Sequence, residues 1–184
     1  MIEAEQDAVR FCITFDDGFE SVKKLNELEK EIPYILYLAT GYIETSRKFW
    51  AIELERIIMS SQVDEINLSS FQLSSYNLSS VGNKELAISK LNSEVKKYHP
   101  ADIEAIIKYL RHKLITEPEI ITNNSFLSWS DIRDLINNGM EVGGHTHRHV
   151  ISTMVTPVEF KREVCKSNQL ILDNTGLKSK HFAY

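Results

Sequence analysis

The order of apolar and amphipathic segments near the N-terminus constrains the fold of this chain most. Residues 9–15 form a short apolar run typical of a buried strand, and residues 34–39 form a second one. Between them, residues 21–31 show the apolar spacing of a helix, which Pro33 ends. Strand, helix and strand at this spacing predict a βαβ unit, and therefore an α/β fold with a parallel sheet.

The same β/α rhythm returns in the last third of the chain. Ser128 and Asp131 resemble a capping box at the start of a helix that Gly139 ends. We expect the remaining elements in the order strand 140–144, helix 156–175 and strand 180–184. Because the chain ends inside a strand, its sheet is expected to have an unfinished edge. Such an edge invites pairing with another chain, which predicts a homo-oligomer through it.

The segment 44–127 lacks clear strand patterns and is expected to be a helical insertion within a single, partial domain over 1–184. Helices are expected over residues 49–59, 84–98 and 100–114. In the second of these, Leu86, Leu91 and Val95 are expected to face inwards. Residues 60–82 are rich in Ser and Leu and give no prediction.

Charge and cysteine content exclude several classes of protein. The formal net charge is −5 and no basic stripe occurs, so we expect no nucleic-acid partner. Cys12 and Cys165 match no metal or redox spacing, and Cys12 is expected to be buried. No apolar run is long enough to span a membrane, and the acidic start does not resemble a signal peptide. We therefore expect a cytoplasmic chain.

Two adjacent carboxylates directly follow the first predicted strand. Asp16 and Asp17 precede Gly18, which can adopt the positive φ of a sharp turn. At the carboxyl end of a strand, where α/β folds place their sites, Asp17 is expected to bind a metal and Asp16 to stay free as a general base. The alternative is an Asx turn that merely ends the strand.

A histidine-rich segment directly follows the predicted strand 140–144. His145 and His149 are four residues apart, so on one helical turn both rings would lie on the same side and bind one metal ion. His147 is out of phase with this pair and is expected to be exposed or to support the ligands. The alternative is a polar loop that happens to hold histidines.

Both motifs follow strands of one predicted sheet and should meet at the same edge. One carboxylate and two imidazoles leave metal positions open for water and a carbonyl oxygen, as in metal-activated hydrolases. Zn²⁺ suits these ligands best, and Co²⁺, Ni²⁺ or Mn²⁺ would also bind them.

These motifs resemble those of the polysaccharide deacetylase family, the NodB-homology carbohydrate esterases. The first family motif stands intact as Thr14 to Gly18, and the second as His145-Thr146-x-x-His149. Further similar segments are Tyr37 to Ile43, Phe49-Trp50, Glu53 to Glu55, Leu127 to Trp129 and the terminal Phe182-Ala183-Tyr184. The resemblance extends over nearly the whole chain, in the family's order.

The resemblance implies a distorted, incomplete (β/α) barrel and a metal-dependent hydrolase. Its substrate would be an N-acetylated sugar of a poly- or oligosaccharide, often a surface polysaccharide, from which it removes an acetyl group. By motif, Asp16 is the general base, and Asp17, His145 and His149 hold the metal. The backbone N–H of Tyr184 is then a candidate oxyanion donor.

The chain also departs from the family pattern. There is no arginine at the third motif, and the later motifs, including the histidine that serves as general acid, are absent from this sequence. None of His99, His112 and His181 matches the position of that histidine. A second hypothesis is therefore a catalytically silent domain that binds metal or glycan.

Overall fold

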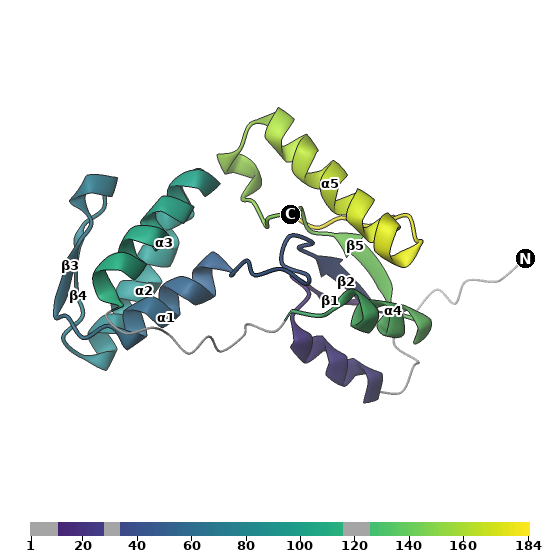
Figure 1. Ribbon diagram of the computed structural model, residues 1–184, viewed down its shortest axis with the longest axis horizontal. Coiled ribbons are helices and arrows are strands. Elements are labelled where there is room, and N and C mark those ends of the chain that lie inside the picture. The colour runs from purple at the N-terminus through teal and green to yellow at the C-terminus, as the bar shows by residue number, and fades with distance from the viewer. Residues whose placement is uncertain (1–10, 28–33, 116–125) are drawn as a thin grey trace, which may run out of the picture. The chain divides into compact units, whose positions relative to one another are not determined.

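The computed structural model describes residues 11–27, 34–115 and 126–184 (Figure 1). The chain divides into two compact units. The sheet unit holds the described residues up to Glu44, together with 126–149 and Val164–Tyr184. The helical unit holds the described residues of 45–115 together with Val150–Glu163. The single domain with an insertion over 44–127 stays a prediction.

Parallel strands form the sheet of the sheet unit, which confirms the predicted α/β class. In the order in which they pair they are β1 (Ile13–Phe15), β2 (Tyr34–Leu38) and β5 (Glu141–Gly144) (Figure 1). Phe15 lies beside Leu36, and Leu38 lies beside Gly144. The last predicted strand is present as one parallel bridge between Phe182 and Gly144. The described strands form an open sheet rather than a closed barrel.

The prediction that the first strand is buried was wrong for its described residues. Residues 11–14 are exposed, with Phe11 66% exposed, and Cys12 and Cys165 are both exposed free thiols. The physical reason is the position of β1 in the sheet. Among the described strands it pairs with β2 alone, whereas β2 lies between two strands and alternates buried and half-buried residues. An apolar run alone does not distinguish an edge strand from a central one.

Helices cover this sheet and close its core. The first is η1 (Glu20–Glu27), a 3₁₀ helix rather than the expected α-helix, and its Val22 is buried. The rest of that predicted helix lies outside the described residues. α4 (Trp129–Asn137) and the last turns of α5 (Pro157–Thr175) complete the unit. The largest fully buried side chains of its core are Leu36, Leu38, Leu127 and Ile132.

The predicted capping box of α4 is confirmed. The Ser128 hydroxyl accepts a hydrogen bond from the backbone N–H of Asp131. In return, the Asp131 carboxylate accepts a hydrogen bond from the backbone N–H of Ser128 at 2.8 Å. Lys23 lies 3.1 Å from the same carboxylate. Burial alone would raise the pKa of Asp131, but the hydrogen bonds from Ser128 and Lys23 outweigh it and hold that pKa below its ordinary value.

Asp131→Asn is expected to lower the free energy of unfolding at neutral pH, because the amide cannot reproduce this charged cap. The folded-state pKa lies below the unfolded one, so the unfolded chain takes up the proton first as pH falls. The stabilisation is therefore present above the unfolded pKa of about 4 and is lost as pH falls through the folded pKa. Urea titrations at several pH values test this, and a gap between parent and variant that is independent of pH would contradict it.

The helical unit contains the three helices predicted for it, which are α1 (Trp50–Ser60), α2 (Val81–Val95) and α3 (Pro100–Leu114). The apolar stripe of α3 is buried as its spacing indicates. Leu91 and Val95 of α2 are buried as predicted, whereas Leu86 was wrongly placed inside and is 71% exposed. Ala87 is buried in its place, because steps of four keep Ala87, Leu91 and Val95 on one face.

A short β-hairpin also belongs to this unit and was missed. β3 (Glu65–Asn67) and β4 (Ser75–Asn77) pair antiparallel and are joined through η2 (Ser69–Phe71). Only the central residue of each strand, Ile66 or Tyr76, is buried. Strands of this length give too few alternating positions for a sequence pattern to reveal them. A further 3₁₀ turn, η3, spans Ser152–Met154.

Candidate metal centre

The site lies where the strands of the sheet unit end. Asp17 comes two residues after β1, and His145 comes directly after β5. The backbone holds these segments against β2, because His145 N–H donates to Leu38 O at 3.0 Å and Ala39 N–H donates to Asp17 O at 3.3 Å. Parallel pairing therefore brings side chains far apart in sequence to one edge.

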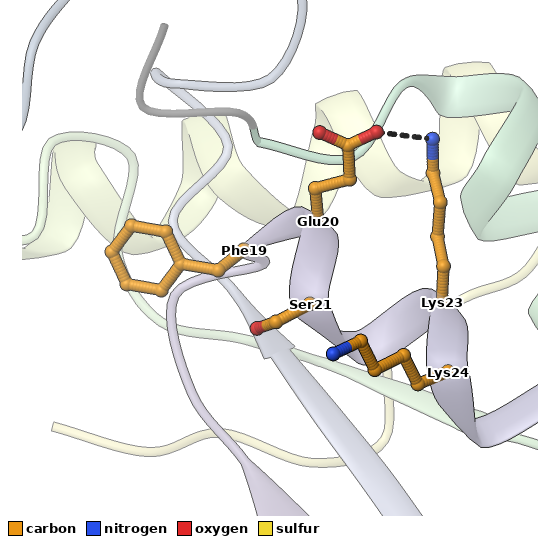
Figure 2. A pocket seen from close by; sticks show the side chains of 5 residues that line it. All are labelled: Phe19, Glu20, Ser21, Lys23 and Lys24. Atoms are coloured by element: carbon orange, nitrogen blue, oxygen red, sulfur yellow. Dashed lines mark hydrogen bonds and ion pairs between the residues drawn. The ribbon is translucent and has the colours of Figure 1, made fainter. Parts of the chain in front are cut away.

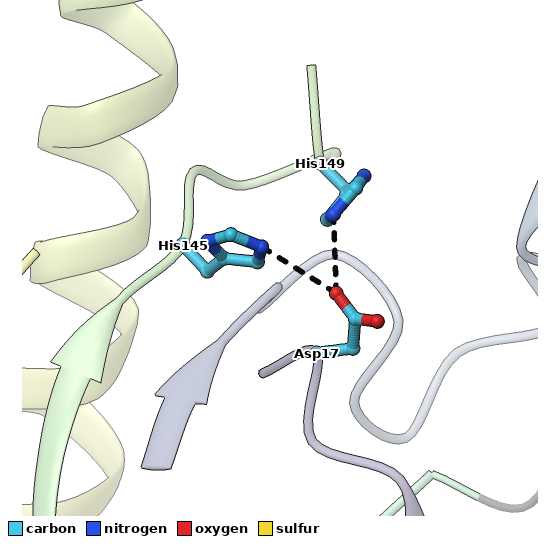
Figure 3. A group of neighbouring side chains, drawn as sticks. All are labelled: Asp17, His145 and His149. Carbon is cyan, nitrogen blue, oxygen red and sulfur yellow. Dashed lines mark ion pairs between the residues drawn. The ribbon is translucent and has the colours of Figure 1, made fainter. Parts of the chain in front are cut away.

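The three side chains predicted as metal ligands point toward one another. Figure 3 shows Asp17 facing both imidazoles. Asp17 Oδ1 lies 3.1 Å from His149 Nε2 and 3.5 Å from His145 Nε2. One ligand atom from each residue lies within 4.8 Å of the others, a spacing that a single ion can bridge.

The chemistry of these atoms fits a divalent metal ion. Within the described residues, Asp17 Oδ1 is buried and accepts no hydrogen bond. A buried carboxylate oxygen without compensation is costly, and a cation between it and the two imidazoles would remove that cost. One carboxylate oxygen and two imidazole nitrogens are usual zinc ligands, and three protein ligands leave a position open.

A backbone carbonyl contacts the ring nitrogen of His145 that faces away from Asp17. His145 Nδ1 lies 3.1 Å from the carbonyl oxygen of Ala183, and the residue is only 8% exposed. Since a carbonyl only accepts, Nδ1 carries a hydrogen in this contact, which leaves Nε2 as the nitrogen of this ring available to bind a metal. Ala183 is itself fixed by its N–H, which donates to Gly144 O at 3.0 Å.

The histidine pair meets through a strained loop rather than through the helical turn expected from its spacing. No helix includes His145–His149. Instead, Thr146 and His149 adopt positive φ values of 61° and 54°. Asp17 also has a positive φ of 72°, so the left-handed turn begins at this ligand itself, before Gly18. Non-glycine residues with such φ values cluster at functional sites.

The remaining predicted residues occupy less constrained positions. Asp16 is exposed beside Asp17. Tyr184 is 89% exposed. Its N–H shares a trans peptide unit with the Ala183 carbonyl, so it points away from the His145 ring that this carbonyl contacts. The roles assigned to Asp16 and Tyr184 stay predictions.

The other histidines lie outside the cluster. His147 is half-buried, with Nδ1 3.1 Å from Thr40 Oγ1, which fits the expected supporting position. His181 Nε2 lies 2.8 Å from Glu141, and His99 caps α3 through the Ala101 N–H. His112 is exposed on α3.

A solvent-open hollow of about 530 Å³ lies at the start of η1. Its first lining residue in the sequence, Phe19, comes two residues after Asp17. Its lining consists of Phe19, Glu20, Ser21, Lys23 and Lys24 (Figure 2). Lys23 lies 2.9 Å from Glu20, which raises the pKa of this lysine. The Phe19 ring stacks on Phe126 with centroids 4.7 Å apart. Sequence reasoning did not find this hollow, because no local pattern marks it.

The chain thus combines a parallel α/β sheet with an Asp-His-His cluster at the carboxyl edge. The family model described as Polysaccharide deacetylase matches residues 4–184, and the chain belongs to this family. A search of curated proteins gives no match.

A solved structure titled as the BpsB deacetylase domain from Bordetella bronchiseptica is similar to this chain, with 13% identity and a TM-score of 0.43. The match covers 93% of this chain and 53% of that one, so the chain spans about half of that structure's length. No helix among the described residues is long and apolar enough to cross a membrane.

Proposed function

We propose that this chain is a metal-dependent hydrolase that removes acetyl groups from N-acetylated sugars of a poly- or oligosaccharide. The observation that carries the proposal is the convergence of Asp17, His145 and His149 at one sheet edge in a member of the polysaccharide deacetylase family. Family membership favours this enzyme over the silent binding domain.

Asp17, His145 and His149 would hold the metal, for which we propose Zn²⁺; the same donors also suit Co²⁺, Ni²⁺ and Mn²⁺. When bound, the ion would acidify the attacking water and stabilise the negative charge that develops on the amide oxygen. The Ala183 carbonyl keeps His145 in the tautomer that this role needs.

Asp16 would act as the general base. Its carboxylate follows β1 directly beside the ligand Asp17 and is exposed, so substrate and water can reach it. It would take the proton of the water that attacks the acetyl carbonyl and pass it to the sugar nitrogen as the C–N bond breaks. The nitrogen then leaves as the free amine, and the acetyl group leaves as acetic acid, which ionises to acetate.

The proposal also covers the shape of the complete fold and the source of the substrate. We infer that the parallel sheet is part of a distorted, incomplete (β/α) barrel, and that the substrate is a surface polysaccharide. Self-association through the unfinished edge of the sheet stays a prediction.

An acetate-release assay tests the proposed function. The purified chain, loaded with Zn²⁺, is incubated with oligomers of N-acetylglucosamine, and acetate and free amine are both quantified. We expect equal amounts of the two products, and their loss after chelation of the metal. A metal-loaded chain that releases no acetate from a panel of N-acetylated oligosaccharides would contradict the proposal and favour the silent binding domain.

A further inference from the structure

The segment between the two histidine ligands holds an unfavourable backbone shape. Thr146 and His149 both have positive φ values, and neither is a glycine. Conformations of this kind persist only where surrounding contacts impose them. The contacts that act on His147 and Arg148, between the ligands, therefore bear on where the two imidazoles lie.

The loop after β2 supplies those contacts, through three successive residues. Thr40 Oγ1 lies 3.1 Å from His147 Nδ1, and the Gly41 N–H donates to the His147 carbonyl at 2.6 Å. The Tyr42 hydroxyl donates to the Arg148 carbonyl at 3.2 Å. Thr40 and Tyr42 are 2% and 4% exposed, so these bonds are shielded from water.

The approach of the two loops leaves no room at Gly41. A Cβ at this position would lie 2.5 Å from the His147 carbonyl oxygen, closer than non-bonded atoms tolerate. A side chain at this position would therefore displace the carbonyl of His147 and the segment that carries it. Tyr42 is held in turn by ring stacking on Phe126, with centroids 5.1 Å apart.

We propose that Thr40, Gly41 and Tyr42 form a clamp that positions His145 and His149 for metal binding. The inference rests on the proposed metal site but not on the reaction. The three residues contact the peptide between the ligands rather than the ligands or the metal, and are positioning residues. Loss of one clamp contact is expected to weaken metal affinity about 10–100-fold, as found for other supporting contacts at metal sites.

Tyr42→Phe removes one hydroxyl and keeps the ring that stacks on Phe126. We expect its Co²⁺ dissociation constant to rise at least about tenfold and the visible absorption bands of bound Co²⁺ to change, since these bands report ligand geometry. Tyr98→Phe is the matched control, because it removes a hydroxyl that donates to the Phe71 carbonyl in the helical unit. Its Co²⁺ affinity and spectrum should equal those of the parent.

Two variants of Thr40 separate a role in positioning the histidine ligands from a general loss of stability. Thr40→Val loses the contact to His147 with little change of shape, whereas Thr40→Ser keeps the hydroxyl and should restore affinity. Parent-like Co²⁺ affinity and spectra in both Tyr42→Phe and Thr40→Val would overturn the clamp while leaving the metal site intact. A parent chain that binds no Co²⁺ would overturn the metal site itself and the clamp with it.

Discussion

Asp16→Asn is expected to lower the rate of acetate release about 10²–10⁴-fold while the metal content stays unchanged. An amide cannot accept the proton of the attacking water, and removal of a general base costs a factor of this size. The change is nearly isosteric and lies at an exposed position, so it should not disturb the fold. The measurement is the initial rate on an N-acetylated oligosaccharide, with the metal content of the same sample determined in parallel.

Asp64→Asn is a suitable control, since Asp64 is exposed in the helical unit and its side chain has no proposed role. It should retain the parent rate. An Asp16→Asn variant that keeps both its metal and its full activity would remove Asp16 as the base. If rate and metal are lost together, Asp16 belongs to the metal-binding set instead.

Saturating metal is expected to stabilise the parent chain strongly. At a free metal concentration of about 100 times Kd, binding to the folded state alone adds about 2.7 kcal/mol to the free energy of unfolding. For a chain of this size that corresponds to a rise in Tm of roughly 5–10 °C. His149→Ala should lose most of this rise, because it removes a nitrogen that lies 3.1 Å from Asp17 Oδ1.

His112→Ala provides the matched comparison, since it removes an exposed imidazole from α3 and should keep the full metal-induced rise. Thermal melts with and without Zn²⁺ on the three proteins decide the matter. Equal metal-induced rises in Tm in the parent and in His149→Ala would mean that the stabilising metal binds outside the Asp17, His145 and His149 cluster.

Much of the fold could be predicted because its signals are local. Pro100 and the apolar stripe of α3 define that helix, and Ser128 with Asp131 defines the start of α4. The predictions that were wrong or missing concern features set by which segments pair with each other, and a local sequence pattern does not identify those segments. The exposure of β1 follows from its edge position, and the hairpin of β3 and β4 follows from pairing between two very short strands.

The candidate site shows the same division. Asp17, His145 and His149 could be proposed because each follows a predicted strand, and parallel strands end at one edge. The left-handed loop that joins the histidines was not predictable, since positive φ at Thr146 is imposed by neighbours. The Ala183 carbonyl and the Thr40–Tyr42 contacts were missed for a related reason. Backbone acceptors carry no residue signature, although residues 37–43 already belonged to a segment similar to the family.

The most direct test of the central claim is the metal content of the purified chain and of His145→Ala, by elemental analysis after exposure to Zn²⁺. The account predicts about one metal ion per parent chain and almost none in the variant, because His145 supplies one of the three converging ligand atoms. A parent chain that retains no metal, or a variant that retains as much as the parent, would contradict it.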